Sequence, residues 1–385
     1  MDTPEHFIPV AEPVLTGNEL AYVSDCVTSG WVSSIGQYVT RFEQDFARFC
    51  GVKHGIATSN GTTALHLALV ALGIRPGDEV IVPSLSFVAT ANAVRYVGAN
   101  PVFADIQSET DLTISAKSIE SRITDRTRAI IVMHYAGYAC DMPSIMQIAE
   151  RYGLAVIEDA AHAAGAALEG RSLGTWGRIG CFSFFSNKNM TTGEGGMLVT
   201  DDDDLAVLLR NLRSHGMTAM TWERHKGHAW SYDVTALGYN YRLDEIRSAI
   251  GRVQLKKLPG NNQRRSQIVA QYHDLLQELS PLITRPFSAH RGTSSYHIFP
   301  ILLPKGSDRV RFMEHMKSKR MQTSIHYPPI HSFSAYADVD RPGRGLLPLT
   351  DDVASREVTL PLYPGLTDAN VVLVANAIHE ALIPA

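Results

Sequence analysis

Ala155-Val156-Ile157-Glu158-Asp159-Ala160-Ala161-His162 starts as an apolar run and ends on an acid followed by small residues. A strand that is covered on both faces has this composition, because neither face meets water. Ile130-Ile131-Val132 is equally apolar and indicates a second such strand. Working outward through the first 200 residues, we predict strands at His54–Thr58, Glu79–Pro83, Pro101–Asp105, Ala129–His134, Ala155–Asp159, Cys181–Phe185 and Met197–Thr200.

Helical patterns lie between these runs, at Thr62–Leu72, Ala89–Val97, Ile114–Ile123 and Met142–Tyr152. Strands that alternate with helices at this spacing predict an α/β fold, with a parallel or mixed sheet flanked by helices. In such sheets ligands bind beyond the carboxyl ends of the strands. Polar residues that follow a predicted strand are therefore the first candidates for a functional site.

The pattern changes after residue 200, where Leu205–Ser214 and Asp244–Leu258 read as helices. Pro259-Gly260-Asn261-Asn262 predicts a helix break, since proline and glycine interrupt helices. An amphipathic helix at Gln263–Leu279 follows, and then mixed strand and helix signals. We therefore expect a large domain at residues 1–255 and a smaller α+β domain at residues 256–385.

Composition supports a two-domain enzyme, since 385 residues divide into about two domains of roughly 150 residues. Apolar residues make up 45% and charged residues 19%, which excludes a disordered chain. Lys and Arg number 35 against 39 Asp and Glu, so a net charge of −4 gives no basic field for nucleic acid. No apolar run reaches the roughly 18 residues of a membrane span, and no signal peptide is visible. The four scattered cysteines read as reduced thiols, so we expect a cytoplasmic protein.

Phe182-Ser183-Phe184-Phe185-Ser186-Asn187-Lys188 carries a lysine to the end of an apolar strand. The glycine-rich turn Gly193-Glu194-Gly195-Gly196 then leads into the next strand. A lysine in this position can lose solvation, which lowers its pKa and frees the amine to attack a carbonyl. By itself the motif is equally consistent with a surface lysine in a turn.

Asp159 makes the chemical interpretation more specific, because it ends a strand 29 residues before Lys188. A buried carboxylate needs a cationic partner. Pyridoxal phosphate (PLP) supplies one in its pyridinium nitrogen, and a lysine with an Asp–pyridinium pair is its recurring protein setting. The alternative for Asp159 is a helix N-cap, and for His162 a structural histidine.

Thr58-Ser59-Asn60-Gly61-Thr62-Thr63 joins a predicted strand to a predicted helix and indicates a phosphate site. Free N–H groups at a helix start bind phosphate without a basic residue. A dehydrogenase is less consistent with the sequence, because no G-x-G-x-x-G follows the first strand. No metal site is expected, and His225 and His228 are interpreted as loop residues that border the substrate.

Taken together, these motifs resemble one family, the DegT/DnrJ/EryC1/StrS aminotransferases, which are nucleotide-sugar aminotransferases of fold type I. The resemblance rests on Ser59–Leu65, Glu158–His162, Ser183–Lys188 and Gly193–Gly196. It extends from Ile8-Pro9-Val10 to Leu360-Pro361-Leu362-Tyr363-Pro364, nearly the whole chain. The fold implied is a large domain with a mixed, mostly parallel sheet flanked by helices, plus a smaller α+β C-terminal domain.

The resemblance implies roles around the PLP ring for four residues. Lys188 would be bonded to the cofactor and would then move the proton of the reacting carbon. Asp159 would keep the pyridine nitrogen protonated, and His162 would lie by the ring hydroxyl. Phe87 matches the aromatic position that stacks on the ring.

The resemblance also implies a phosphate site at Gly61, Thr62 and Ser183. Asn240, within Gly238-Tyr239-Asn240-Tyr241-Arg242, matches an asparagine that reaches the phosphate of the neighbouring subunit. A homodimer with shared active sites is therefore expected. Three further residues, Trp31, Tyr327 and His331, fall in stretches that match family segments near the sugar.

The reaction implied is transamination, because family members that dehydrate a sugar carry histidine where this chain has Lys188. Histidine at position 162 resembles the members that aminate C4 of a nucleotide-linked 4-keto-6-deoxy sugar, with glutamate as donor and 2-oxoglutarate as co-product. Such products feed lipopolysaccharide O-antigen, other surface glycans or antibiotic sugars. The alternatives are C3 amination of a 3-keto sugar or a keto-cyclitol, and, more remotely, a non-enzymatic regulator of the same fold.

Overall fold

A seven-stranded sheet forms the centre of the computed structural model, which describes residues 4, 6–34, 36–218, 233–339 and 346–383. The strand order is β1-β9-β8-β5-β4-β2-β3. All seven predicted strands belong to this sheet, with bounds within two residues of the expected ones. They are β1 (His54–Thr58), β2 (Glu79–Pro83), β3 (Asn100–Ala104), β4 (Thr127–Met133), β5 (Ala155–Asp159), β8 (Ile179–Ser183) and β9 (Gly196–Thr200).

The direction of the strands determines where polar residues gather. β9 pairs antiparallel with both β1 and β8, whereas β8, β5, β4, β2 and β3 pair parallel with one another in that order. The carboxyl ends of β1, β2, β4, β5 and β8 therefore meet at one edge of the sheet. The mixed, mostly parallel α/β fold expected from the sequence is confirmed.

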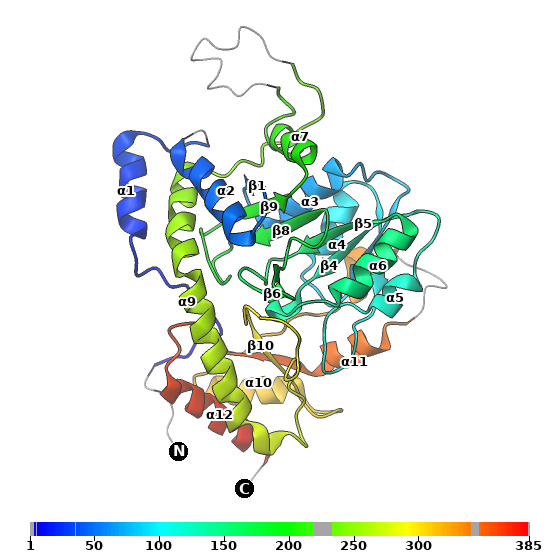
Figure 1. Cartoon of the computed structure of the whole chain (residues 1–385). Coiled ribbons are helices and arrows are strands. Elements are labelled where there is room, and N and C mark those ends of the chain that lie inside the picture. Colours follow the sequence, from blue (N-terminus) through cyan, green and yellow to red (C-terminus); the bar gives the residue numbers. More distant parts are fainter. Residues whose placement is uncertain (1–3, 5, 35, 219–232, 340–345, 384–385) are drawn as a thin grey trace.

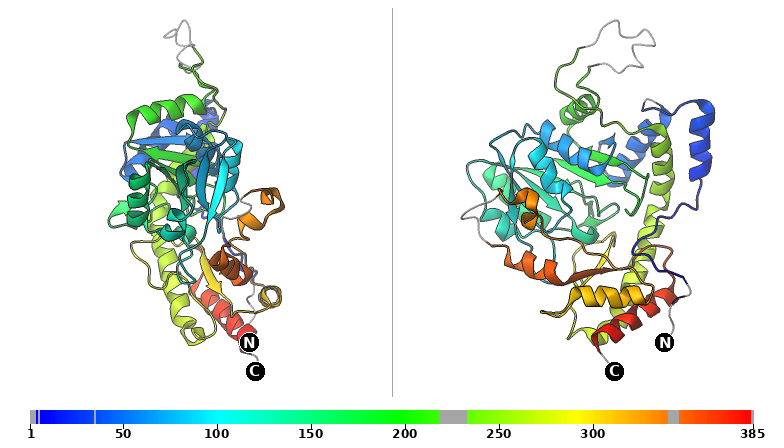
Figure 2. Two further views of the ribbon diagram at one scale, coloured as in Figure 1. Left: turned by 90° about the vertical axis from the view of Figure 1, so that its right-hand side faces the viewer. Right: turned by 180° about the vertical axis from the view of Figure 1, so that it is seen from behind.

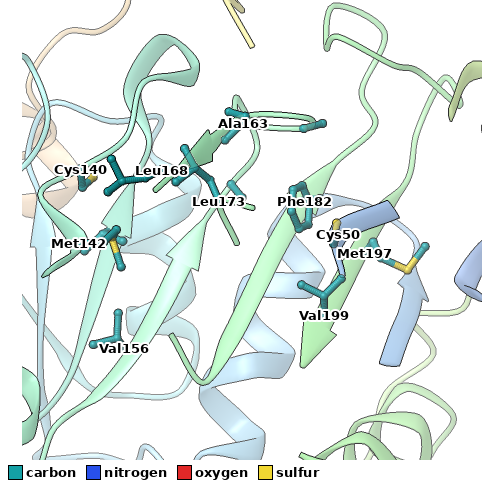
Figure 3. Packing of buried hydrophobic residues seen from close by; sticks show 14 of the residues in the cluster. Cys50, Cys140, Met142, Val156, Ala163, Leu168, Leu173, Phe182, Met197 and Val199 are labelled. Carbon is teal, nitrogen blue, oxygen red and sulfur yellow. The ribbon is translucent and has the colours of Figure 1, made fainter. Parts of the chain in front are cut away.

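Helices cover both faces of this sheet (Figures 1 and 2). One face packs against α2 (Gln37–Cys50), α5 (Ala116–Glu120) and α6 (Met142–Tyr152). Figure 3 shows part of this core, where Phe182, Val156 and Met197 from the strands lie among buried side chains from the loops and helices. The opposite face packs against α3 (Gly61–Ala71), α4 (Ala89–Tyr96) and α7 (Asp203–Arg213).

The long helix α9 (Glu245–Leu275) passes through the predicted break, so that prediction is wrong. Pro259 lies inside the helix, where it removes one backbone N–H and crowds the preceding turn. Tertiary contacts on both sides of the proline outweigh this cost. Leu258 is fully buried in the core of the sheet, and Asn262 donates to the carbonyl of Ala164 at 2.9 Å.

The last part of α9 leads into a second packed unit, as the lower half of Figure 1 shows. Ile268 and Tyr272 of α9 are buried there against a two-stranded antiparallel sheet. Ile8, near the N-terminus, packs into the same core and pairs with Met321. The unit contains β10 (Phe299–Leu302), β11 (Glu357–Leu360), α10 (Arg309–Ser318) and α12 (Asp368–Leu382). Residues 1–255 and 256–385 remain our proposed domains.

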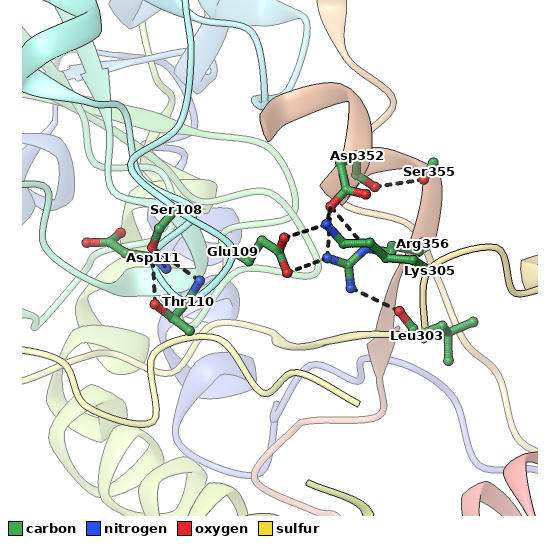
Figure 4. Close-up of polar contacts among 9 residues, drawn as sticks. All are labelled: Ser108, Glu109, Thr110, Asp111, Leu303, Lys305, Asp352, Ser355 and Arg356. Carbon is green, nitrogen blue, oxygen red and sulfur yellow. Dashed lines mark hydrogen bonds and ion pairs between the residues drawn. The ribbon is translucent and has the colours of Figure 1, made fainter. Parts of the chain in front are cut away.

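A group of charged side chains joins the two parts of the chain (Figure 4). Arg356, at the end of α11 (Pro348–Arg356), donates to Glu109 and Asp352 at 2.7 and 2.8 Å. Lys305 lies 2.8 Å from the same Glu109, which follows β3 in the chain. Arg356 is buried and also donates to the carbonyl of Leu303, so its charge is well compensated. These contacts hold α11, which leads into β11, against the large sheet unit.

The remaining elements are short or were not predicted. The helix expected at Ile114–Ile123 is confined to α5, because Ser115 caps its start. α1 (Glu19–Ser29) and α2 were not predicted, and the small elements are β6 (Ala167–Leu168), β7 (Arg171–Ser172), η1 (Tyr135–Gly137), η2 (Gln277–Leu279), η3 (Ile330–Ser332) and η4 (Ser334–Tyr336). All four cysteines are buried free thiols. Over the described ranges, we find no helix with the length and apolar character that crossing a membrane requires.

Candidate active site

Lys188 lies in the turn that follows β8, at the edge where the parallel strands end. Burial lowers the pKa of its amine to about 8, although the nearby Asp159 carboxylate opposes this shift. A larger fraction of the amine is therefore neutral near pH 7 than in an exposed lysine. The next residue holds the turn in place, because buried Asn189 donates to Asn262 Oδ1 at 2.8 Å and to the carbonyl of Ser295 at 2.7 Å.

Asp159 ends β5 and is buried, with 5% of its surface exposed. Its Oδ2 accepts a hydrogen bond from Thr90 at 2.7 Å, and its Oδ1 accepts from the N–H of Ala161 at 3.2 Å. Burial raises the pKa of this carboxyl, and the two hydrogen bonds and the charge of Lys188 only oppose that effect. Because the pKa of this carboxyl stays raised in spite of these contacts, a further cation beside it would stabilise its charged form.

His162 lies beside Asp159 in the chain, and its ring orientation can be assigned from its two hydrogen bonds. The N–H of Ala136 donates to Nδ1 at 3.3 Å, so the ring proton is on Nε2. Nε2 lies 3.0 Å from the Tyr327 hydroxyl and therefore donates to it. Burial, and then the charge of Lys188, lower the pKa of His162 well below its usual range, which keeps the ring neutral.

Phe87 and Tyr327 form an aromatic group at the same edge, with ring centroids 6.0 Å apart. Phe87 follows β2 and is 55% exposed, so its ring is open to a ligand. Behind His162 lies the buried His297, with ring centroids 4.1 Å apart. Asn189 Oδ1 lies 2.8 Å from His297 Nδ1, which links this second histidine to the turn of Lys188.

The predicted phosphate residues come together where α3 begins. The side chain and carbonyl of Asn60 accept from the N–H groups of Thr63 and Ala64, respectively. In the part of the chain that is described, the N–H groups of Gly61 and Thr62 have no protein acceptor. A Cβ on Gly61 would lie 2.8 Å from Ser183 Cβ, so the end of β8 approaches this helix start closely. The arrangement suits an anion such as a phosphate.

We predict that Gly61→Ala weakens binding of a phosphate-bearing ligand at this position. The added methyl group has to displace Ser183, and overpacking of this kind costs about 1–3 kcal/mol. Affinity should fall about tenfold or more, since 1.4 kcal/mol corresponds to a factor of ten. Titration of the purified apoprotein with PLP, followed by absorbance, measures the change in affinity.

Gly260→Ala is the matched control for this substitution. Gly260 lies in α9, and a Cβ there would meet nothing within 4 Å. Alanine should stabilise the helix by about 0.5–1 kcal/mol and leave ligand affinity unchanged. Unaltered affinity in Gly61→Ala would rule out a phosphate site at this helix start.

Three predicted residues lie apart from this group. Asn240 is exposed and forms a bridge with Ser214, and Trp31, between α1 and α2, is 39% exposed. His331 has both ring nitrogens engaged within the chain, by Ser84 Oγ at 2.7 Å and by Asp351 at 3.1 Å. In the single chain, His331 therefore joins η3 to the end of β2. The roles of these three residues at the site stay predictions.

Several residues of the site were missed by the sequence analysis. Thr90, Asn189, His297 and His326 were not assigned to the site, although Asn189 and His326 stand directly beside the candidates Lys188 and Tyr327 in the chain. His225 and His228 lie outside the described residues. Within the described ranges, no cluster of three or more His, Cys, Asp or Glu side chains could hold a metal ion.

Comparison with known proteins agrees with this geometry. Residues 13–379 match the DegT/DnrJ/EryC1/StrS aminotransferase family. The chain is 40% identical to GDP-perosamine synthase from Caulobacter vibrioides, and the alignment covers 98% of each protein. Its structure is similar to that of the aminotransferase TlmJ from Streptoalloteichus hindustanus, with a TM-score of 0.89, 34% identity, and 98% and 99% of the two chains covered. It is also similar to the PLP form of Spr1654 from Streptococcus pneumoniae, with a TM-score of 0.88, 26% identity and 98% of both chains covered.

Proposed function

Because the chain belongs to the DegT/DnrJ/EryC1/StrS aminotransferase family, we propose that it converts a nucleotide-linked 4-keto-6-deoxy sugar to the 4-amino sugar with PLP and glutamate. The observation that carries this proposal is the pairing, at one sheet edge, of a lysine of lowered pKa with a buried carboxylate. The relative named GDP-perosamine synthase supports a nucleotide-linked sugar as substrate.

The residues at the sheet edge fit PLP. Asp159 is a buried acid that a pyridinium cation would stabilise. Phe87 offers an exposed ring, and its carbonyl accepts from the N–H of Thr90, the residue that also bonds Asp159. Gly61, Thr62 and Ser183 form a cradle for a phosphate, which needs no basic side chain because the N–H groups of the helix start face the anion. The net charge of −4 is therefore compatible with strongly anionic ligands.

The residues of this chain would divide the work of amino transfer. When bound, PLP supplies an electron sink that stabilises negative charge on the reacting carbon. Lys188 holds the cofactor and moves the proton of that carbon, for which a pKa of about 8 is suited because it lies close to the working pH. His162 stays neutral and donates through Nε2, so it orients Tyr327 without adding a competing positive charge.

A second copy of the chain would complete the site. Asn240 is exposed in the single chain, as expected for a side chain that reaches the phosphate of a neighbouring subunit. α1 also carries exposed apolar side chains, with Leu20 78% and Val27 61% exposed, which a subunit contact would cover. We therefore propose a homodimer with two shared active sites.

The preference for C4 rests on His162, since histidine at this position resembles the C4-aminating members of the family. C3 amination, or amination of a keto-cyclitol, is the second candidate within the same chemistry. Products of either kind would enter O-antigen, another surface glycan or an antibiotic sugar. A non-enzymatic regulator would not require Lys188 and Asp159 to be placed together at the sheet edge.

Product analysis tests this proposal directly. The purified protein with PLP and glutamate is incubated with GDP-linked and dTDP-linked 4-keto-6-deoxy sugars and, separately, with a 3-keto sugar. We expect amine formation at C4, seen by NMR of the product, with one 2-oxoglutarate released per amine. Amination of the 3-keto sugar alone would overturn the assignment to C4, and no turnover of any keto sugar would overturn the proposed function.

A further inference from the structure

His326 is held at three points, although no sequence motif marks it. Its backbone N–H donates to Glu357 Oε2 at 2.8 Å, and its backbone carbonyl accepts from the hydroxyl of Tyr135. Its ring Nδ1 lies 2.8 Å from Thr359 Oγ1. Among the described residues no partner is found for Nε2, and the ring is near enough to Lys188 for that charge to lower its pKa. One nitrogen of a fixed imidazole is thus left available at the active-site edge.

Glu357 and Thr359 stand behind this ring on β11. Residues two apart on a strand point to the same face, and the Thr359 hydroxyl donates to Glu357 Oε1 at 2.6 Å. Both side chains are fully buried. Burial raises the pKa of Glu357 to about 8, an effect that the bonds from Thr359 and His326 and the charge of Arg309 only reduce.

The three side chains have two consistent hydrogen-bond arrangements. With Glu357 ionised, Thr359 donates to it, so Thr359 accepts from Nδ1–H of His326 and Nε2 is an acceptor. With Glu357 protonated at Oε1, it donates to Thr359, Thr359 donates to Nδ1, and Nε2 carries the ring proton. The second arrangement contains one proton more than the first, and His326 is neutral in both.

His326 is unsuited to hold a positive charge itself. Burial, and then the charge of Lys188, lower its pKa to about 4. A proton that reaches Nε2 is therefore stable only if Nδ1 gives up its own proton to Thr359. Glu357 is the group that gains by receiving it, because protonation removes a buried charge.

We infer that His326, Thr359 and Glu357 form a proton relay that takes one proton from the ammonium of the amino donor and returns it to the amine of the product. This inference rests on the proposed function, because it requires a substrate that arrives as an ammonium ion. It assigns His326 Nε2 as the group that touches the amino group, and Thr359 and Glu357 as positioning residues behind it.

The transfer balances in atoms and electrons. An N–H bond of the ammonium breaks and leaves its electron pair on nitrogen, which becomes nucleophilic, while a new N–H bond forms at Nε2. The proton of Nδ1 moves to Thr359 Oγ1, and the proton of Thr359 moves to Glu357 Oε1. Nothing is oxidised or reduced. The reverse sequence protonates the product amine, so the relay is reset after one complete turnover.

The pH at which the relay changes state depends on the groups that face it. Besides the members themselves, these are the aromatic hydroxyls of Tyr135 and Tyr327, the guanidinium of Arg309, the amine of Lys188, and the rings of His162 and His297. Both hydroxyls have a raised pKa and stay neutral, and both rings have a lowered pKa. Glu357 is therefore the member that changes charge near pH 8.

The ring tautomer of His326 is the direct test, and it does not depend on turnover. Protein labelled with ¹⁵N-histidine is measured by NMR between pH 6.5 and 9.5, and His326→Asn identifies the signals. We expect the proton on Nε2 at the lower pH and on Nδ1 at the higher pH, with a midpoint near 8. A tautomer that does not change over this range would overturn the relay and leave a purely structural contact.

Two substitutions separate the relay from simple packing. In Glu357→Gln the amide oxygen has to face the backbone N–H of His326, so the amide NH₂ donates to Thr359. Thr359 then donates to Nδ1 of His326, and the ring proton stays on Nε2 at every pH. Thr359→Val removes the connecting hydroxyl at equal size and should abolish the pH-dependent change, whereas Thr359→Ser should keep it. Glu278→Gln, at an exposed position in η2, is the neutral control. A wild-type pH response in Glu357→Gln would contradict the relay.

Rapid mixing with glutamate supplies the kinetic measurement. In wild type the rate of the first half-reaction should rise through pH 8, and in Glu357→Gln it should be about 10²-fold lower and lose this rise. Thr359→Val should slow this half-reaction in the same way, whereas Thr359→Ser should keep the wild-type rate. Absence of keto-sugar amination together with a normal tautomer change would defeat the proposed function, while the pH-dependent hydrogen-bond chain of His326, Thr359 and Glu357 would still be present. Amination by the wild-type protein with no tautomer change would support the proposed function and overturn the relay.

Discussion

Lys188→Ala is expected to abolish amino transfer, with a rate loss of about 10⁴-fold or more. In the proposed mechanism, the variant loses both the amine that holds the cofactor and the base that moves the proton of the reacting carbon. The turn that carries Lys188 is held in place by the bonds of Asn189, so the backbone of the site should keep its position in the variant. Production of amino sugar is measured by NMR, and the absorbance of covalently held PLP is recorded on the same sample.

Lys117→Ala is the control for this experiment, since Lys117 is exposed on α5, outside the site. It should leave both activity and absorbance unchanged. The Lys188→Ala protein should remain folded, because the substitution removes an amine whose burial disfavours its charged form. An unchanged cofactor spectrum in Lys188→Ala would show that this lysine is not the point of attachment.

Asp159→Asn should separate stability from function. Loss of the charge removes the partner that we propose for the pyridinium nitrogen, and a hydrogen bond to a charged group contributes about 1.5–3 kcal/mol. PLP should therefore bind about 10- to 100-fold more weakly, and turnover should fall about 10²–10³-fold because the electron sink is impaired. Equilibrium titration with PLP and steady-state rates measure the two effects.

The stability of the apoprotein should change in the opposite sense. The pKa of Asp159 is raised in the folded state, so folding favours its neutral form and becomes less favourable as pH rises through that pKa. Asparagine resembles the neutral form, because its oxygen can accept from the N–H of Ala161 while its NH₂ donates to the hydroxyl of Thr90. At neutral pH the apoprotein of the variant should be as stable as wild type or more stable, as judged by urea unfolding.

Asp105→Asn is a matched control for Asp159→Asn. Asp105 also follows a parallel strand, β3, and its carboxylate accepts from Thr350 at 2.8 and 2.7 Å. These bonds cap α11, so the substitution should reduce stability by about 1 kcal/mol without changing PLP affinity. Equal losses of PLP affinity in both variants would argue against a specific role for Asp159.

The strands, and the positions of Lys188 and Asp159 at the edge of the sheet, could be predicted because their signals are local. A continuous apolar run such as Ile130-Ile131-Val132 has no polar face to expose, and it forms part of β4 as expected. Asp159 ends one such strand and Lys188 lies in the turn that follows another, and strands of one direction end at one edge of the sheet. The helix start at Gly61 was similarly visible as a strand followed by polar capping residues.

The errors arose where distant contacts override local preference. Pro259 normally ends a helix, yet α9 continues through it because the residues on both sides are buried in different cores. Local periodicity does not record this compensation. The miss of α2 has a different cause, because its sequence does carry a local helical period: Val39, Phe42 and Phe46 recur on one face and are buried in the main core.

Sequence alone was sufficient for the α/β class, the lysine and aspartate at the strand ends, and the family that these motifs resemble. Only the folded chain shows which groups control those residues. The hydroxyl of Tyr327 meets His162 across 165 residues, Asn189 meets Asn262 across 73, and His326 meets Thr359 across 33. Short-range patterns specify the secondary structure that a segment forms by itself. Burial and long-range hydrogen bonds set the pKa of Lys188 and, in the proposed relay, the position of the proton on His326. These depend on packing between segments, which no local pattern contains.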